Sequence, residues 1–256
     1  MRKFFTIASL LAVALSSCTN EVAQSEAEGK GSVVIALDVE TNIEETRTNV
    51  NCTTPELGDF SVRIEGITDA SYVADYDSVE AFNENNSLFE GSYRATVTAG
   101  NINDEGYDKA TFVGSATFDV EARDHKDVNI TALIANAMVK VEVTDAFKAY
   151  FTGGHSLTLT TAVGNEFDVT EQSAPIFIAP TSFKISGTAV KQPNQSGAAG
   201  TTVTLPEVRK SKLAAQTLYT VKLDVENAGQ ATLVITLNDE VEEVAPIEQE
   251  LNDNAQ

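Results

Sequence analysis

The stretch Ala137-Met138-Val139-Lys140-Val141-Glu142-Val143 alternates apolar and charged residues with a period of two over its second half. In an extended chain successive side chains point to opposite faces, so the valines face one side while Lys140 and Glu142 face the other. One apolar face and one charged face are typical of a strand that lies between a core and water. The stretch is therefore predicted to be a half-buried β-strand.

Strands of the same kind are predicted along most of the chain. Each is short, rich in β-branched or alternating apolar residues, and bounded by Gly, Asn or Asp. No long stretch has apolar residues at helical spacing, so the pattern favours an all-β fold with antiparallel strands. The further predicted strands cover residues 32–39, 60–64, 93–99, 117–120, 126–130, 155–161, 175–179, 182–190, 201–205, 218–225, 231–237 and 241–251.

The length of the chain predicts two domains. Short strands separated by turns about every 8–12 residues favour β-sandwiches, in which each sheet buries one face against another sheet. A chain of 256 residues is long for one sandwich and comfortable for two. We predict two antiparallel β-sandwich domains in tandem, residues 31–133 and 134–251.

One short helix is predicted directly after the strand 137–143, in Asp145-Ala146-Phe147-Lys148-Ala149-Tyr150-Phe151. Asp145 is its predicted N-cap, accepting hydrogen bonds from the first free amides. Phe147 and Phe151 stand four residues apart and therefore share one face, which we expect to pack into the core. A pair of glycines after this segment ends the helix.

The N-terminus carries the features of a bacterial lipoprotein signal. A basic start, Arg2-Lys3, precedes an apolar run at 4–15 that is too short to span a membrane, and Leu15-Ser16-Ser17-Cys18 has the form of a lipobox. We predict a signal peptide at 1–17, acylation of Cys18 and a flexible polar tether at 18–30. An ordinary cleaved signal with a chance cysteine is the alternative.

The composition argues against several classes of function. Lys and Arg number 17 against 38 Asp and Glu, a net charge of −21, and such a surface repels nucleic-acid phosphates. The sequence has no nucleophile elbow, zinc-protease motif or phosphate-binding loop, and His125 and His155 are too isolated for a zinc site. Cys52 is predicted to be a structural thiol. We predict a non-enzymatic protein with no cofactor, no metal and no nucleic-acid partner.

Several stretches carry a family resemblance. They are the lipobox, Leu88-Phe89-Glu90-Gly91-Ser92-Tyr93, Gly114-Ser115-Ala116-Thr117-Phe118, Ala135-Asn136-Ala137-Met138-Val139-Lys140-Val141 and the predicted helix 145–151. With them the chain resembles an uncharacterised family of Bacteroidales lipoproteins, related in style to fimbrillin-like proteins. The resemblance covers nearly the whole mature chain and carries over no active-site residues.

The resemblance implies a fold, a location and a role. Two transthyretin-like or immunoglobulin-like β-sandwiches are expected, in a pilus subunit, anchor or accessory protein with a structural or adhesive role. Acidic residues soon after Cys18 also resemble surface-export signals of Bacteroidetes lipoproteins. The protein is therefore expected on the outer membrane, held by the lipid on Cys18 and displayed on the cell surface.

The resemblance also implies a candidate processing site and a kind of partner. In fimbriae of this type the lipidated precursor is cut after an arginine, the first strand is released, and a strand of another subunit fills the groove. Arg47 follows the first predicted strand, so a cut there would remove strand 32–39 and the lipid together. The alternatives are an ordinary exposed loop arginine, or an anchor protein that stays uncut.

Glycan binding is the alternative function. Sugar sites commonly use exposed aromatic platforms, and this chain has no Trp and 6 Tyr. Tyr72, Tyr76 and Tyr107, together with Phe82, lie in segments interpreted as loops and form the candidate ligand platform. Core packing for Phe82 and a solvent-edge position for the tyrosines is the other interpretation.

Overall fold

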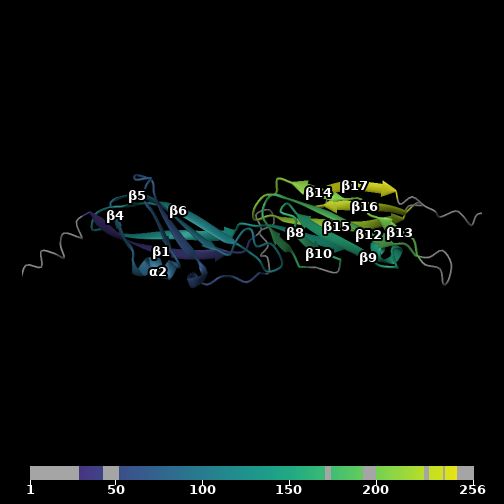
Figure 1. Ribbon diagram of the computed structural model, residues 1–256, viewed down its shortest axis with the longest axis horizontal. Coiled ribbons are helices and arrows are strands. Elements are labelled where there is room, and N and C mark those ends of the chain that lie inside the picture. The colour runs from purple at the N-terminus through teal and green to yellow at the C-terminus, as the bar shows by residue number, and fades with distance from the viewer. Residues whose placement is uncertain are drawn as a thin grey trace, which may run out of the picture.

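The computed structural model describes residues 29–42, 52–170, 174–192, 200–227, 231–238 and 240–246. Over these ranges the protein consists mainly of strands, with two short α-helices and one 3-10 helix. The buried side chains form two cores, one built mainly by residues before Ala137 and the other by residues from Ala137 onward. Figure 1 shows the two β units end to end along the long axis, with the purple first strand and the yellow last strands toward opposite ends.

The first unit contains one seven-stranded sheet, in the order β3-β2-β5-β6-β7-β1-β4. Val33 on the first strand and Val62 on the second lie in the same buried core although β1 and β2 stand far apart in this order. The sheet therefore curves around its own apolar face. Its elements are β1 (Lys30–Glu40), η1 (Leu57–Asp59), β2 (Ser61–Gly66), β3 (Val73–Tyr76), α2 (Val79–Glu84), β4 (Ser87–Phe89), β5 (Gly91–Ala99), β6 (Phe112–Val120) and β7 (His125–Ile134).

Helix α2 packs against the first core beside β1, β2 and β3. Its Val79 and Phe82 are buried, and Ser78 is the N-cap, with its hydroxyl accepting a hydrogen bond from the Ala81 N–H at 3.0 Å. That bond satisfies one of the amides left free in the first helical turn. The prediction of a loop in this segment was wrong for Val79–Glu84.

The second unit is a sandwich of two five-stranded sheets. One has the order β11-β8-β15-β16-β17; the other has the order β10-β9-β12-β13, with β14 also paired to β12. Apolar side chains of both sheets meet in one core. The elements are β8 (Ala137–Val143), α3 (Asp145–Tyr150), β9 (His155–Thr161), β10 (Glu166–Asp168), β11 (Ile176–Ile178), β12 (Ser182–Val190), β13 (Thr202–Thr204), β14 (Val208–Ser211), β15 (Leu218–Asn227), β16 (Ala231–Leu237) and β17 (Glu240–Pro246).

Helix α3 lies where it was predicted, after β8. Phe147 and Phe151 are buried, with ring centroids 4.6 Å apart, so the prediction that they pack into the core is confirmed. The N-cap is Thr144, however, and not Asp145: the Thr144 hydroxyl accepts a hydrogen bond from the Phe147 N–H at 3.2 Å. Asp145 lies in the first turn, where its negative charge interacts favourably with the positive end of the helix dipole. No helix among the described residues is long and apolar enough to cross a membrane.

The all-β fold is confirmed, but two of its strand pairs are parallel where antiparallel strands were predicted. Strand β1 pairs in parallel with β7, and β8 pairs in parallel with β15. Alternation of apolar and polar residues fixes which face a strand buries and does not fix the direction of its neighbour. Four short strands, β3, β4, β10 and β14, were not predicted. The domain limits 31–133 and 134–251 stay a prediction.

The loop after β5 joins the two units. Gly106 and Phe177 exchange two backbone hydrogen bonds of 2.9 Å. Glu105 is 8% exposed, and its carboxylate accepts hydrogen bonds of 3.0 Å from the Ala179 N–H and from the Asn165 amide. The Phe177 ring lies in the first core although β11 belongs to the second unit. These contacts fix the units to each other through backbone and side chains.

Candidate functional site

The backbone of strand β1 in the first unit is hydrogen-bonded in a different way on each of its two sides. It runs parallel to β7 over nine paired positions, from Ser32↔His125 to Glu40↔Leu133. On its other side β4 covers only Lys30 to Ser32, in antiparallel register. Val33 and Ile35 are fully or almost fully buried. The strand is thus a structural part of the core that is held firmly along one side only.

Asn83 of α2 supplies the attachment on the other side. Its Oδ1 accepts a hydrogen bond from the Ile35 N–H at 2.9 Å, and its Nδ2 donates to the Ile35 carbonyl oxygen at 3.0 Å. The Val33 N–H donates to the Asn86 carbonyl oxygen at 2.8 Å. A primary amide that bonds to both the N–H and the carbonyl of one residue supplies the two hydrogen bonds that a neighbouring strand would supply. The slot for β1 therefore recognises backbone, which any extended segment offers.

The structure separates the three tyrosines of the candidate ligand platform. Tyr72 and Tyr76 pack at the first core, edge-on against Tyr93 at 5.5 Å and against Phe82 at 5.1 Å respectively. Phe82 is fully buried, in agreement with the core interpretation. Tyr107 packs instead against the second core, where its hydroxyl donates to the Asp168 carbonyl oxygen at 3.2 Å. Tyr72 and Tyr76 are neighbours, and Tyr107 stands apart from them.

Tyr72 has the largest pKa change of this group. Burial, followed by the nearby Tyr76 and Tyr93 hydroxyls, raises the pKa of Tyr72 from 10.0 to about 12. The phenolate is poorly solvated in this position, so the neutral form is favoured. Tyr72 is thus a neutral hydrogen-bonding group at any physiological pH and not a general base.

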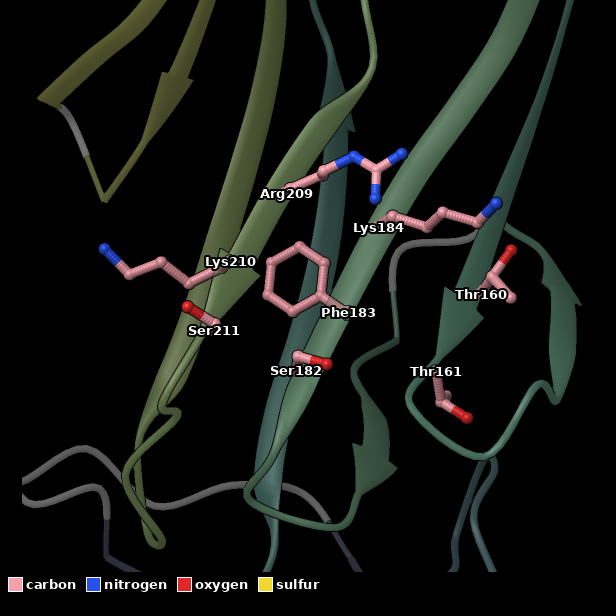
Figure 2. A pocket seen from close by; sticks show the side chains of 8 residues that line it. All are labelled: Thr160, Thr161, Ser182, Phe183, Lys184, Arg209, Lys210 and Ser211. Atoms are coloured by element: carbon pink, nitrogen blue, oxygen red, sulfur yellow. The ribbon is translucent and has the colours of Figure 1, made fainter.

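A second candidate site lies on the outer face of the second unit, on β9, β12 and β14. Figure 2 shows a hollow there with the side chains of Lys184 and Arg209 extending across neighbouring strands. The hollow has a volume of about 380 Å³, and its eight lining residues include three basic residues and no acidic ones: Thr160, Thr161, Ser182, Phe183, Lys184, Arg209, Lys210 and Ser211.

The remaining sequence-predicted positions carry no assembled chemistry. Cys18 and Arg47 lie outside the described residues, so acylation and processing stay predictions. Burial, and secondarily Asp108, raise the pKa of the Cys52 thiol, which makes it a weaker nucleophile. His155 bonds to the Thr170 carbonyl oxygen and His125 to the Ser32 hydroxyl. Among the described residues no group of three or more His, Cys, Asp or Glu is arranged to hold a metal.

The fold defines a class: a protein of two β units in tandem, built almost entirely of strands. The chain belongs to the family described as domain of unknown function DUF4493, whose profile matches residues 29–252. The prediction of an uncharacterised family of this type is confirmed. No curated protein matches the chain.

Several solved structures of bacterial proteins match most of the chain. A fimbrial assembly protein from Parabacteroides distasonis is 11% identical with a TM-score of 0.46, over 86% of this chain and 98% of that chain. A proposed cell adhesion protein from Bacteroides eggerthii is 8% identical with a TM-score of 0.43, over 84% and 96%. A proposed polysaccharide-binding protein from Bacteroides thetaiotaomicron is 10% identical with a TM-score of 0.39, over 87% and 99%.

Two features of these sites were missed by the sequence analysis. Asn83 lies in a segment that was interpreted as a loop, although Ser78 followed by apolar residues at 79 and 82 has the form of a capped helix. The basic hollow combines Arg209 and Lys210 with Lys184, which the chain separates widely and the sheet brings together. The capped helix that carries Asn83 could have been predicted from the sequence, whereas the grouping of Lys184 with Arg209 could be known only from the strand register.

Proposed function

We propose that this protein is a non-enzymatic cell-surface lipoprotein with a structural or adhesive role, as a fimbrillin-like pilus subunit, anchor or accessory protein. The observation that carries the proposal is the attachment of β1. This strand pairs with β7 on one side, and on the other side its backbone is held by the short strand β4 and by Asn83 and Asn86. A strand of another subunit offers the same backbone groups, so it could occupy the same slot by β-augmentation.

Loss of β1 would leave the first core open. Val33 and Ile35 are buried, and Leu37 and Val39 pack partly against the same core. Burial of apolar side chains of this size contributes about 1.5–3 kcal/mol each. A chain cut at Arg47 would therefore expose an apolar groove that is stable only when another strand fills it. A cut chain is therefore expected to assemble by strand exchange and not to persist as a monomer.

Strand exchange is tested by electrophoresis of protein from cells without boiling. A pilus role predicts SDS-resistant ladders that disappear when residues 231–251 are deleted. The Arg47 proposal is tested separately by N-terminal sequencing, which should return a chain that begins at Thr48. A single acylated N-terminus at Cys18 would rule out processing and leave the anchor role. Labelling with radioactive palmitate tests the lipid itself, with Cys18→Ser as the unlabelled control.

Glycan binding through Tyr72 and Tyr76 is the second proposed function. The observation that favours it is that these two half-buried tyrosines are neighbours at the surface of the first core. Aromatic faces of this kind stack on sugar rings. Binding on a sugar array that is lost in Tyr72→Ala and Tyr76→Ala would support it. Equal binding by the variants and the wild type would contradict it.

A further inference from the structure

Exposed apolar side chains gather at the end of the first unit that lies away from the second unit. Six large apolar side chains are exposed among the described residues, and three of them belong to this end: Ile67, Val73 and Phe89, which are 51%, 47% and 59% exposed. Figure 1 shows β4, which carries Phe89, and the purple start of β1 at this outer end. Single exposed apolar residues are ordinary on a protein surface, whereas a group of them on a small area indicates a contact surface.

Two turns at this end bring Ile67 close to Phe89. Strand β4 ends at Phe89, β5 begins at Gly91, and the Ile67 N–H donates a hydrogen bond of 2.7 Å to the Ser92 carbonyl oxygen. The Ser92 N–H in turn donates to the Thr68 hydroxyl at 3.0 Å. The turn after β2 and the turn between β4 and β5 are therefore bonded to each other.

Tyr72 and Val73 belong to the same place. The half-buried Tyr72 precedes Val73, the first residue of β3, and its ring lies edge-on against the Tyr93 ring with the centroids 5.5 Å apart. The Tyr93 hydroxyl donates to the Phe89 carbonyl oxygen at 3.0 Å. One packed group thus links β3 to the end of β4, and we refer to Ile67, Tyr72, Val73 and Phe89 as the apolar tip.

Strand β1 begins at the apolar tip. The Lys30 Nζ lies 4.7 Å from the centroid of the Phe89 ring, and the Glu90 N–H donates to the Gly29 carbonyl oxygen at 2.7 Å. Gly29 follows Cys18 by 11 positions, and a chain of that length reaches at most about 40 Å when fully extended. A lipid on Cys18 would therefore hold the apolar tip nearer to the membrane than any part of the second unit.

The charges around the apolar tip favour a neutral lipid surface. The turn that contains Arg123 is also at this end, because the Arg123 N–H donates to the Lys30 carbonyl oxygen at 2.7 Å. Acidic residues outnumber basic ones in the turns that adjoin the tip, and an anionic leaflet would be repelled. The ionisable residues of these turns are Asp69, Glu90, Glu121 and Asp124 against Lys30 and Arg123.

We propose that the apolar tip contacts the membrane that holds the protein, with Phe89, Ile67 and Val73 in the interfacial layer of a neutral phospholipid leaflet. Apolar groups at this boundary of headgroups and acyl chains lie about 5–10 Å deep. Lys30, beside Phe89, can keep its ammonium group among the headgroups while its stem covers the ring. The inference rests on the proposed acylation of Cys18 and goes beyond it, because a tether alone sets no orientation.

Tryptophan fluorescence tests the contact, since the chain contains no Trp. The acylated full-length Phe89→Trp protein is bound to phosphatidylcholine vesicles with and without brominated acyl chains, which quench indole emission. About half or more of the emission should be lost at interfacial depth. Val163→Trp is the matched control, because Val163 is 65% exposed and follows β9 in the second unit. Strand β1 alone separates the two units' outer positions by roughly 35 Å, so this variant should lose less than about a tenth of its emission.

The same preparations separate failure of the tip contact from failure of the lipid anchor. Mass spectrometry shows whether Cys18 carries acyl chains, and a chain without them overturns both proposals. An acylated protein that floats with the vesicles while Phe89→Trp stays unquenched overturns the tip contact alone. Equal quenching of Phe89→Trp and Val163→Trp also contradicts it, because the protein then has no preferred orientation.

Further changes test the apolar and the electrostatic arguments. Adding Ile67→Ser and Val73→Ser to Phe89→Trp should reduce the quenching by about twofold or more, with an unchanged urea midpoint because both side chains are exposed. Anionic lipid at about half of the total should also reduce it. Unchanged quenching in either experiment contradicts the proposal. A dimer of the Cys18→Ser protein that Phe89→Ser abolishes would assign the tip to a second copy of the chain and overturn the membrane contact.

Discussion

The side-chain amide of Asn83 forms two hydrogen bonds with the backbone of Ile35, 2.9 Å to its N–H and 3.0 Å to its carbonyl oxygen. The two residues are 48 positions apart, and the contact joins α2 to the free side of β1. A helix residue thus completes the hydrogen bonding of a strand at a point where β4 has already ended.

Asn83→Ala should destabilise the protein by about 1–3 kcal/mol, because it leaves both backbone groups of the buried Ile35 without this partner. The measurement is urea denaturation of the full-length protein, followed by circular dichroism. Asn85→Ala is the matched control, since Asn85 lies at the same end of the helix and its side-chain amide donates a solvent-exposed hydrogen bond to the Ala81 carbonyl oxygen. If both variants unfold at the same urea concentration, Asn83 is not what holds β1.

Phe177→Ala should destabilise the first unit although Phe177 belongs to a strand of the second. Its ring lies in the first core, whereas the adjacent Ile178 lies in the second core. Removing a buried phenylalanine costs about 3–5 kcal/mol. Hydrogen exchange should show lost protection in β5 and β6 for Phe177→Ala, and in β9 and β15 for Ile178→Ala. The same pattern in both variants would contradict the division of these two side chains between the cores.

Thr144→Ala should cost about 1–2 kcal/mol, since it removes the N-cap of α3 together with a 2.6 Å hydrogen bond to Asp224. Asp145→Ala should cost less than about 1 kcal/mol, because Asp145 contributes only through the helix dipole. Thermal denaturation of the two variants gives the comparison. A larger effect for Asp145→Ala would restore the original prediction for the cap.

Tyr72 should make the stability of the protein fall between pH 10 and pH 12. Burial first, and then Tyr76 and Tyr93, raise the pKa of Tyr72 to about 12 in the folded protein, while an unfolded tyrosine titrates near pH 10. Its stabilising contribution is complete below pH 10 and is lost as the pH rises toward 12, because only the unfolded chain releases the proton in that range.

The measurement for Tyr72 is the urea midpoint at several pH values in that window. Tyr72→Phe cannot ionise, so the decline with pH should be shallower in this variant than in the wild type. Absorbance titration of the folded wild type should also show delayed ionisation of several tyrosines, because burial raises the pKa of Tyr93, Tyr107 and Tyr150 too, with Tyr72 ionising last. Identical slopes for wild type and Tyr72→Phe would show that this phenol titrates normally.

The strands were predictable from sequence because each carries its own evidence. Alternation at β8 and β12 fixes the buried face from local residues alone, and both strands begin and end where predicted. The parallel pairing of β1 with β7 was not predictable in this way, since direction depends on the path of the whole chain. The N-cap was misplaced by one position because Thr144 and Asp145 are both good caps.

The candidate sites depended more heavily on long-range register. Tyr72, Tyr76 and Tyr107 were predicted to form one platform, but Tyr72 and Tyr76 pack at the first core and Tyr107 packs at the second. The row formed by Thr160, Lys184 and Arg209 comes from three strands. The local sequence does not predict that these residues are neighbours, because the alternation within a strand shows only on which face of the sheet a side chain lies.

The parallel pairing of β1 with β7 also sets an order of events during folding. Ser32 and His125 are partners in the sheet although 93 positions separate them. The β5–β6 hairpin can close as soon as its own residues exist, whereas the place for β1 appears only after β7 has been synthesised. Strand β1, although it is made early, therefore joins the sheet only after β7, and β4, which pairs with β1 alone, joins with it. Until β1 has paired, the backbone groups along the edge of β7 are unpaired. Another strand that reaches this edge first can pair with it in parallel, so the rate of pairing as well as its affinity decides which strand binds there.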